Sequence, residues 1–558
     1  MNPDPEDQAE DRPQLGTLTI DDRRTAPQGN RLKQRHVQMQ VSSYRVLRCL
    51  TFPLSHRIAI AGTLGTGLFL GSGEAIQGAG PIGALIAYAL VSTVAFASLS
   101  AVGEMTCFAP IVGTFPHYAS RWVDPALGFA AGWNYFYANA ITMPVEISGA
   151  QLLIGYWDPN PDHQWIYTLV LCLSICLINV FGVRRFGEVE FVFGFIKLTM
   201  ITILIVIGLV IDLGGAPNHD RLGFRYWKDP GPFARAGLVS NRDLDQFLGF
   251  LSVIVQAAFS FQGMEIAAIA AVVTESPRRN VARAIRKTFY RILIFYIFGI
   301  LLAGMIVPSN DPDLLKPFSD PTQGNVSESP FVIAMKHASI KTVPSVVNAG
   351  LVTSAFSAAN SFSFAASRIL QGLAANRQAP SIFKITYNDT PIAAVLFTCS
   401  FGLLSFMSLS HGAGTVFRWF VNLSTVGGFF GWVTINLTYL CFYQGLKHHN
   451  IDRTQFIYRS AFQPWLSIWG LVMCISFILI NGFQVFWNFK LQANDFVASY
   501  INIPLFFGLY AYWKVTRKTR VRSVEERDFI KGIPSIAETE TEYRRPHGFW
   551  ERVADVVF

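Results

Sequence analysis

Four ionisable side chains lie deep inside apolar runs of this sequence: Glu104, Glu146, Lys197 and Glu265. A charge buried in such a run is costly, so these residues are candidates for substrate, ion or proton binding. A buried lysine either finds an acidic partner or gives up its proton. Other charged residues lie nearer the ends of the runs, where a long side chain can reach polar surroundings: Glu188, Glu190, Arg291, Arg368 and Arg418.

The segment Gly62–Gly67 reads GTLGTG inside the apolar run 58–73. Glycine and threonine are poor helix formers, so we expect the helix to break here. Amide groups freed inside an apolar helix must be satisfied by a cavity or a ligand. Two half-helix ends that meet offer an anion site on one side and a cation site on the other. An amino acid carries both charges, so the break points to a zwitterionic ligand.

The segment Phe259–Glu265 (FSFQGME) is a second small and polar interruption of an apolar helix. Two broken helices, the first and the sixth, indicate an inverted repeat of five plus five helices. The binding site of such a repeat lies at the interface between its halves.

The four ionisable residues inside the apolar runs allow more than one interpretation. Glu265 either caps the break or carries a proton, or it is a hydrogen-bonded carboxyl that holds the break open. Lys197 could bridge to the first break as a fixed or switchable cation. Glu146 follows Pro144 and contacts substrate, responds to protons or is structural. Glu104, at the end of its run, is interpreted as structural.

Composition indicates the environment of these residues. Of 558 residues, 51% are hydrophobic and 15% are charged, whereas a soluble protein carries about 25% charged residues. The sequence therefore predicts an all-α integral membrane protein. The net charge of +8 is concentrated in the tails and alternate loops, which reflects membrane topology and not nucleic-acid binding. The seven cysteines are interpreted as buried apolar residues without disulfide or metal.

Twelve apolar runs are about long enough to span a bilayer. They lie near 58–77, 82–104, 126–154, 166–182, 186–213, 246–275, 286–307, 346–375, 392–410, 415–443, 465–487 and 496–514. Basic residues cluster in the even-numbered loops and in the carboxy-terminal tail, so both termini are predicted to be cytoplasmic.

Enzymatic signatures are missing from the sequence. The glycine cluster lies between apolar helices and not between a strand and a helix, as a nucleotide-binding loop would. No GxxxxGK[ST], HExxH or CxxC motif occurs. We therefore expect a protein that is not an enzyme, with no metal and no organic cofactor.

Several longer stretches carry a resemblance. They are Ile60–Gly73 (IAGTLGTGLFLGSG), Val123–Tyr135 (VDPALGFAAGWNY), Gly214–Asp229 (GGAPNHDRLGFRYWKD), Ser357–Arg368 (SAANSFSFAASR) and Phe462–Trp465 (FQPW). In these the chain resembles the fungal amino-acid permeases of the amino acid–polyamine–organocation superfamily, over nearly everything from Ile58 onward. The resemblance implies proton-driven amino-acid uptake through a core of LeuT-like topology.

The resemblance also implies roles for individual residues. The amides around Thr63, Gly65, Thr66 and Gly67 would receive the substrate carboxylate. Carbonyls of Phe259, Ser260 and Gln262 would receive its ammonium, with Phe259 as an aromatic gate. Lys197 would stand where sodium-coupled relatives bind an ion, and protons would be the coupling ion. Glu146, Ser424 and Thr425 would line the side-chain pocket, and Glu265 joins Lys197 among the coupling residues.

The domain boundaries follow from the runs. Residues 1–57 form a cytoplasmic tail, 58–514 the twelve-helix permease domain, and 515–558 a second cytoplasmic tail. Residues 40–57 separate Arg35–Met39 from the first run and interrupt the family pattern. Because they begin Gln-Val-Ser and end Ser-His-Arg, we hypothesise that they come from a retained intron.

The sequence therefore predicts a plasma-membrane amino-acid/proton symporter with broad, mainly neutral specificity. Alternatives are a sensor that binds amino acids without moving them, and a permease for a basic amino acid or for a polyamine- or choline-like amine. The expected partners are the amino acid and the lipid bilayer, with ubiquitin and trafficking machinery on the tails.

Overall fold

The computed structural model describes residues 65–111, 113–266, 276–314, 329–387, 390–487 and 493–536. The chain divides into two units, Met1–Cys49 and Leu50–Phe558, and the described residues all belong to the second. Thr63, the segment 40–57 and most of both tails lie outside the described residues. Within them the regular secondary structure is helical, and an isolated bridge joins Tyr387 to Thr390.

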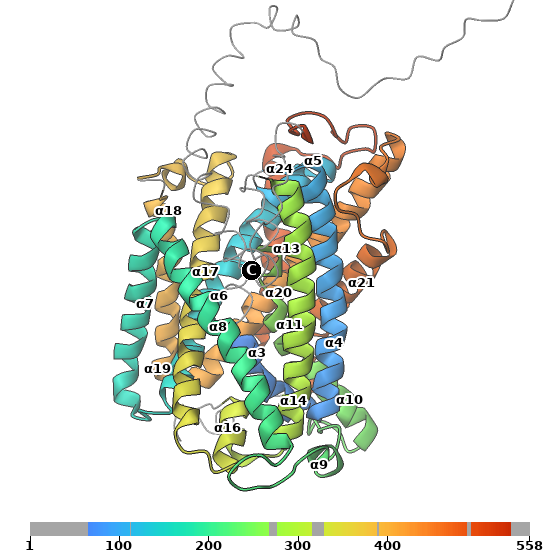
Figure 1. Ribbon diagram of the computed structural model, residues 1–558. Coiled ribbons are helices and arrows are strands. Elements are labelled where there is room, and N and C mark those ends of the chain that lie inside the picture. The colour runs from blue at the N-terminus through green and yellow to red at the C-terminus, as the bar shows by residue number, and fades with distance from the viewer. Residues whose placement is uncertain are drawn as a thin grey trace, which may run out of the picture. The chain divides into compact units, whose positions relative to one another are not determined.

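The first part of the bundle is built from long helices and two short ones, α3 and α5 (Figure 1). They are α3 (Thr66–Phe69), α4 (Gly71–Phe108), α5 (Thr114–Trp122), α6 (Pro125–Ile154), α7 (Gln164–Val180) and α8 (Val183–Asp212). α4 covers parts of two predicted spans. Its Gly80 has φ +78° and Pro81 follows, so the helix axis is interrupted where the first predicted span gives way to the second.

The middle of the chain contains shorter helices. They are α9 (Arg225–Lys228), α10 (Arg242–Ser252), α11 (Ile254–Phe261), α13 (Pro277–Ile292), α14 (Phe298–Ile306), α16 (Pro330–His337) and the long α17 (Val343–Ala375). A π-helical stretch, Leu293–Ile297, joins α13 to α14.

The last part comprises α18 (Ile392–Ser400), α19 (Ser408–His411), α20 (Ala413–His448), α21 (Trp465–Ile480), α22 (Phe483–Trp487), α23 (Ala493–Tyr500) and α24 (Asn502–Arg517). Two predicted spans are less regular than expected. The run 392–410 passes through a 3-10 stretch at Phe401–Met407, and the run 496–514 is bent by 46° between α23 and α24.

Seven helical stretches of the described residues are long and apolar enough to cross a membrane, and an eighth is added if α23 and α24 form one span. Large apolar side chains are exposed on α7, α8 and α21: Leu173, Leu177, Val192, Phe195, Val472 and Leu479. An apolar outer surface of this kind fits contact with lipid. The predicted spans 126–154 and 346–375 match α6 and α17 in position, although neither helix is among the seven. The count of twelve stays a prediction.

The centre of the bundle is formed by α6, which packs against α17 on one side and α20 on the other. α6 begins sharply, because Asp124 accepts the amide of Ala126 at 2.9 Å and Pro125 occupies the first helical position, an arrangement that favours helix initiation. α11 packs against α4, and α3 contacts α6, α11 and α17. These contacts bring both predicted helix breaks to the centre.

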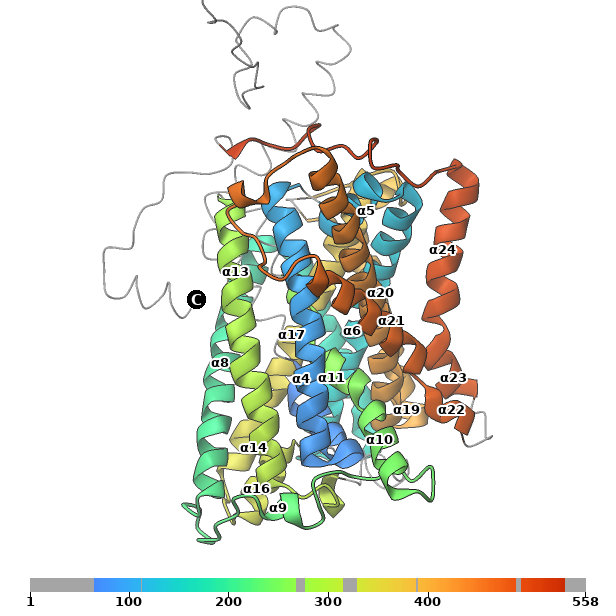
Figure 2. The same cartoon turned by 90° about the vertical axis from the view of Figure 1, so that its right-hand side faces the viewer.

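After α24 the chain crosses one end of the bundle as an extended segment, residues 518–536, which we call the C-terminal strap. Figure 2 shows it in red beside α5. Phe529 stacks on Trp122 with ring centroids 5.7 Å apart. Asp528 forms an ion pair with Arg121 at 3.2 Å, and Arg278 of α13 donates to the carbonyl of Pro534 at 2.6 Å. The strap therefore links α5, α13 and the carboxy-terminal end of α24.

Candidate functional site

The first predicted break lies beside a buried carboxylate. Gly65 is extended (φ −130°, ψ −158°) and α3 begins at Thr66. The Thr66 amide donates to Oε2 of Glu146 at 3.1 Å, and a Cβ placed on Gly65 would overlap Oε1 of the same carboxyl. Glu146 comes from the middle of α6 and is 2% exposed. One of the amides predicted to receive a substrate carboxylate is therefore occupied by a carboxylate of the protein itself.

The next residues bring α3 against α11. A Cβ on Gly67 would lie 2.8 Å from Cα of Ser260 and 3.1 Å from Cδ1 of Phe259. Tyr88 of α4 spans the contact: its hydroxyl is 3.3 Å from the Gly67 carbonyl and 3.0 Å from Oγ of Ser260. Tyr88 was not among the predicted site residues, since nothing in the sequence distinguishes it from other buried aromatic residues.

The second predicted break is confirmed. α11 ends at Phe261, Gln262 is extended (φ −66°, ψ 143°), and Gly263 has φ +87°, a conformation that favours glycine. The Gln262 side chain pairs with Ser424 of α20, donating from Nε2 to the Ser424 carbonyl at 2.7 Å and accepting from Oγ at 2.9 Å. Ser424 Oγ also lies 2.5 Å from Oγ1 of Thr142 on α6. The break is thus tied to α20 and α6.

Two predicted substrate-binding residues, Thr66 of the first break and Thr425 of the side-chain pocket, have buried hydroxyl groups. The Oγ1 atoms of Thr66 and Thr425 are buried and have no hydrogen-bond partner among the described residues. The Phe259 ring meets Phe417 of α20 edge-on, with centroids 6.4 Å apart. The region between the two breaks is therefore lined by aromatic faces and by hydroxyls that can still bond.

Glu265 lies apart from these contacts. Its Oε2 accepts the indole N–H of Trp432 on α20 at 3.4 Å, and the residue is buried. This bond links the second break to α20.

Lys197 is fully buried on α8, and the charges of Glu190 and Glu146 both act on it. Glu190 corrects the sequence interpretation, because its side chain does not extend out of the bundle at the end of the span but lies buried among polar side chains. It is 0% exposed and accepts hydrogen bonds from Ser357 and Ser361 of α17 at 2.7 and 2.6 Å. The position of Glu190 near the end of an apolar run did not predict its burial, because α17 covers this part of α8.

Glu104 is buried in an ion pair at one end of the bundle. Its two carboxylate oxygens receive the Arg453 guanidinium at 2.6 and 2.9 Å, and Oε2 also accepts the Ser460 amide at 3.1 Å. A carboxylate with all these partners has a structural role, as the sequence suggested.

The structure brings most of the predicted residues into one connected region. Gly65, Thr66 and Gly67 meet Glu146, Phe259 and Ser260, while Gln262 joins Ser424. Thr425 follows Ser424, the charges of Lys197 and Glu146 act on each other, and Glu265 lies three residues beyond Gln262 in the sixth span. Thr63 lies outside the described residues.

A cavity of about 1020 Å³ opens next to this region, between α4, α10, α11, α20, α21 and α23. It is lined by charges of both signs and by amides, among them Glu74, Arg235, Gln256, Arg418, Asn422 and Asp495. Gln256 is one turn from Ser260 on α11, so the cavity leads toward the contact between α3 and α11. Its mixed charge suits a zwitterion.

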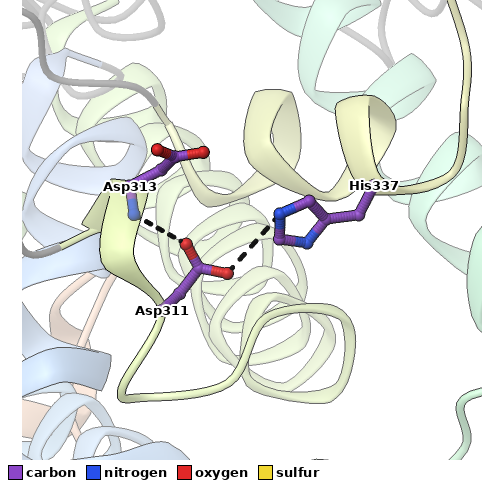
Figure 3. Close-up of side chains that lie close together, drawn as sticks. All are labelled: Asp311, Asp313 and His337. Atoms are coloured by element: carbon purple, nitrogen blue, oxygen red, sulfur yellow. Dashed lines mark hydrogen bonds and ion pairs between the residues drawn. The ribbon is translucent and has the colours of Figure 1, made fainter.

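Figure 3 shows a separate cluster of Asp311, Asp313 and His337, whose ligand atoms lie within 4.8 Å of one another. Asp311 Oδ1 accepts the amide of Asp313 at 2.9 Å, and Oδ2 lies 3.7 Å from Nε2 of His337. Both oxygens of Asp311 are already engaged, so this contact ties the segment after α14 to α16 and we assign no metal to it.

The chain is similar to known proteins over most of its length. Residues 55–526 match the model of the amino acid permease family. The chain is 39% identical to the proline-specific permease of Emericella nidulans, covering 89% of this chain and 90% of that protein. It is 38% identical to the dicarboxylic amino acid permease of Saccharomyces cerevisiae (83% and 76% covered) and 33% identical to that organism's basic amino-acid permease (94% and 88%).

Among solved structures, the chain is similar to the manganese transporter of Eremococcus coleocola, with a TM-score of 0.50 and 12% identity over 84% of this chain and 94% of that one. At this identity the likeness concerns the fold alone.

Proposed function

Because the chain belongs to the amino acid permease family, we propose that it is a secondary active transporter that imports amino acids by proton symport. It works by alternating access in the plasma membrane, with both termini cytoplasmic, and the first ten of its twelve spans form a five-plus-five inverted repeat. The two breaks, at Gly65–Thr66 and at Gln262–Gly263, support this repeat because they meet at the centre of the bundle.

The observation that carries the proposal is the hydrogen bond from the Thr66 amide to Glu146. A substrate carboxylate that binds at this helix start must compete with the Glu146 carboxylate for the same donor. Charged hydrogen bonds of this kind are worth about 1.5–3 kcal/mol, and neutral ones about 0.5–1.5 kcal/mol. The substrate is therefore admitted most easily when Glu146 is neutral.

Competition of this kind couples two ligands. When Glu146 takes up a proton, it becomes a poorer acceptor and the Thr66 amide becomes available to the substrate carboxylate. By linkage, substrate binding then favours proton binding by the same factor. Net positive charge that moves inward also gains about 2.3 kcal/mol per charge for each 100 mV of membrane potential.

The other end of the substrate is served by the second break. The carbonyls of Phe259, Ser260 and Gln262 receive the ammonium, and Phe259 closes over the bound molecule. Main-chain groups bind the part that all amino acids share, whereas the pocket near Ser424 and Thr425 sees the side chain. Relatives described as permeases for proline, dicarboxylic and basic amino acids fit a common head-group site with variable side-chain selection.

Uptake of a panel of labelled amino acids in a permease-deficient yeast tests the proposal. We expect saturable uptake that is broad among neutral amino acids and abolished by a protonophore. Surface-localised protein that binds amino acids but takes none up would indicate a sensor. Competition by carboxylate-free amines without competition by amino acids would indicate an amine permease, since the Thr66 amide would then have no anion to bind.

A further inference from the structure

Glu190 is a buried acidic residue to which the proposed mechanism so far gives no role. It lies on α8, seven residues before Lys197, so the two side chains lie on one face of the helix, about two turns apart. Both are 0% exposed. Side chains on a helix lean toward its N-terminus, which directs the long lysine chain back toward Glu190.

The carboxylate of Glu190 is surrounded by hydrogen-bond donors from α17. Ser357 and Ser361 donate to Oε1 at 2.7 and 2.6 Å, and the Asn360 amide donates to Oε2 at 3.2 Å. Asn360 is itself held by Asn179 of α7, whose amide donates to its carbonyl oxygen at 2.8 Å. Three donors spaced i, i+3 and i+4 on α17 thus converge on one carboxylate.

Few other charges belong to the described side chains of the helices around Glu190. The described ionisable side chains of the helices packed against α8 are Tyr167, Cys172 and Cys176 of α7, Lys336 and His337 of α16, and Arg368 of α17. Arg368, two turns beyond Ser361, bonds to Gln371 at 3.1 Å, and Tyr167 bonds to Asp158 at 2.6 Å. On α8 itself Glu188 is exposed. Among the side chains that the structure describes, the ammonium of Lys197 is therefore the cation placed to balance Glu190.

The charges around Lys197 do not cancel. One ammonium faces two carboxylates, Glu190 and Glu146, and a buried charge without a counter-charge is costly. Among the described residues, side chains of three α17 residues donate to Glu190, whereas the donors to Glu146 come from one residue, Thr66. Glu146 has fewer hydrogen-bond donors than Glu190. It is therefore the carboxylate whose negative charge Lys197 leaves without a counter-charge.

We infer that Glu190 is the permanent counter-ion of Lys197, and that this pairing leaves Glu146 able to exchange its proton. Glu190 is then a positioning residue for proton coupling, and Lys197 is a fixed cation. Without Glu190, Lys197 takes Glu146 as its counter-ion, which keeps Glu146 ionised whether or not substrate is present. This inference rests on the proposed proton symport.

The test replaces Glu190 by glutamine and compares two transport modes in reconstituted vesicles. Glu190→Gln should retain counterflow exchange of labelled substrate within a few-fold of wild type. It should lose at least about tenfold of proton-driven accumulation, and its uptake should no longer depend on external pH. Glu188→Gln, the same substitution on an exposed residue of the same helix, should match wild type in both modes. Glu190→Asp, which keeps the charge, should restore most of the accumulation.

If Glu190→Gln does not fold, a second variant still tests the inference. The double variant Glu190→Gln/Lys197→Met removes the pair together and should again accumulate substrate in a pH-dependent way. An uncoupled double variant would mean that Lys197 carries the proton and would overturn the inference, as would a Glu190→Gln protein with wild-type accumulation and pH profile. If the wild type itself shows no proton-dependent uptake, the proposed symport fails before any variant is compared.

Discussion

A close approach between the two broken helices, at Gly67, can be tested by adding one methyl group. Gly67 faces Ser260 and Phe259, and a Cβ at this position would lie 2.8 Å from Cα of Ser260, 3.0 Å from its Oγ and 3.1 Å from Cδ1 of Phe259. The nearest atom belongs to the backbone, so no rotation of a side chain relieves the overlap. Gly67→Ala must move α3 and α11 apart.

The size of the effect follows from these distances. Ordinary contact begins near 3.4 Å, so the half-helices must separate by roughly 0.6 Å. Overpacking of this kind costs about 1–3 kcal/mol, and the better helix propensity of alanine returns about 0.5–1 kcal/mol. We expect a net loss of stability of about 0–2.5 kcal/mol, with a larger functional effect, because the amides and carbonyls of the site no longer face each other. Uptake should fall at least about tenfold.

Labelled uptake at matched surface amounts, with the melting temperature of the solubilised protein, measures both effects. Gly508→Ala on α24 is the matched control, because a Cβ there meets nothing within 4 Å, and it should leave uptake unchanged. Wild-type uptake by Gly67→Ala would refute the view that the site depends on this close approach.

Three further perturbations have expected outcomes. Arg453→Ala leaves the Glu104 carboxylate buried without its bidentate partner, so we expect a loss of about 3–5 kcal/mol in stability, seen as a lower melting temperature. Ser424→Ala removes the donor to Oε1 of Gln262, which should cost about 1–3 kcal/mol and change the ranking of substrates in a competition panel. Burial raises the pKa of Asp528, but backbone N–H groups of its turn and a neighbouring guanidinium outweigh it and lower the pKa. The strap should therefore keep this stabilisation above the ordinary aspartate pKa of about 3.9 and lose it as the pH falls through the lower folded value, measured as hydrogen-exchange protection of the strap.

Each of these has a control. Arg459→Ala, an exposed arginine of the same loop, should leave the melting temperature unchanged, and an equal effect of both arginine variants would contradict the ion-pair argument. Ser424→Thr keeps the hydroxyl and should keep the substrate ranking. Asp528→Asn should lower the hydrogen-exchange protection of the C-terminal strap at neutral pH. Unchanged protection would mean that the Asp528 carboxylate does not stabilise the strap.

Sequence reasoning located the breaks because glycine and threonine have a direct backbone meaning. The helix start at Thr66 and the non-helical Gln262–Gly263 follow from residue types that resist helix formation. Burial of Glu146 and Lys197 was likewise predictable, because each lies in the middle of an apolar run. All of these depend on local sequence alone.

The partners of these residues depend on which helices meet, and sequence did not contain that information. Glu190 was interpreted as reaching polar surroundings, yet α17 covers it with Ser357 and Ser361. Tyr88 gained its role only from the crossing of α4 and α11. Both breaks were recognised, but the bond between Thr66 and Glu146, which carries the proposed mechanism, required the packing of α3 on α6.

The most direct test of the central claim records substrate uptake and external pH together, in cells that express the wild type or Glu146→Gln. We predict that addition of a transported amino acid alkalinises the medium of wild-type cells in proportion to uptake. Glu146→Gln should bind or exchange the amino acid without moving protons. Uptake by the wild type without alkalinisation, or equal proton movement by Glu146→Gln, would contradict the account.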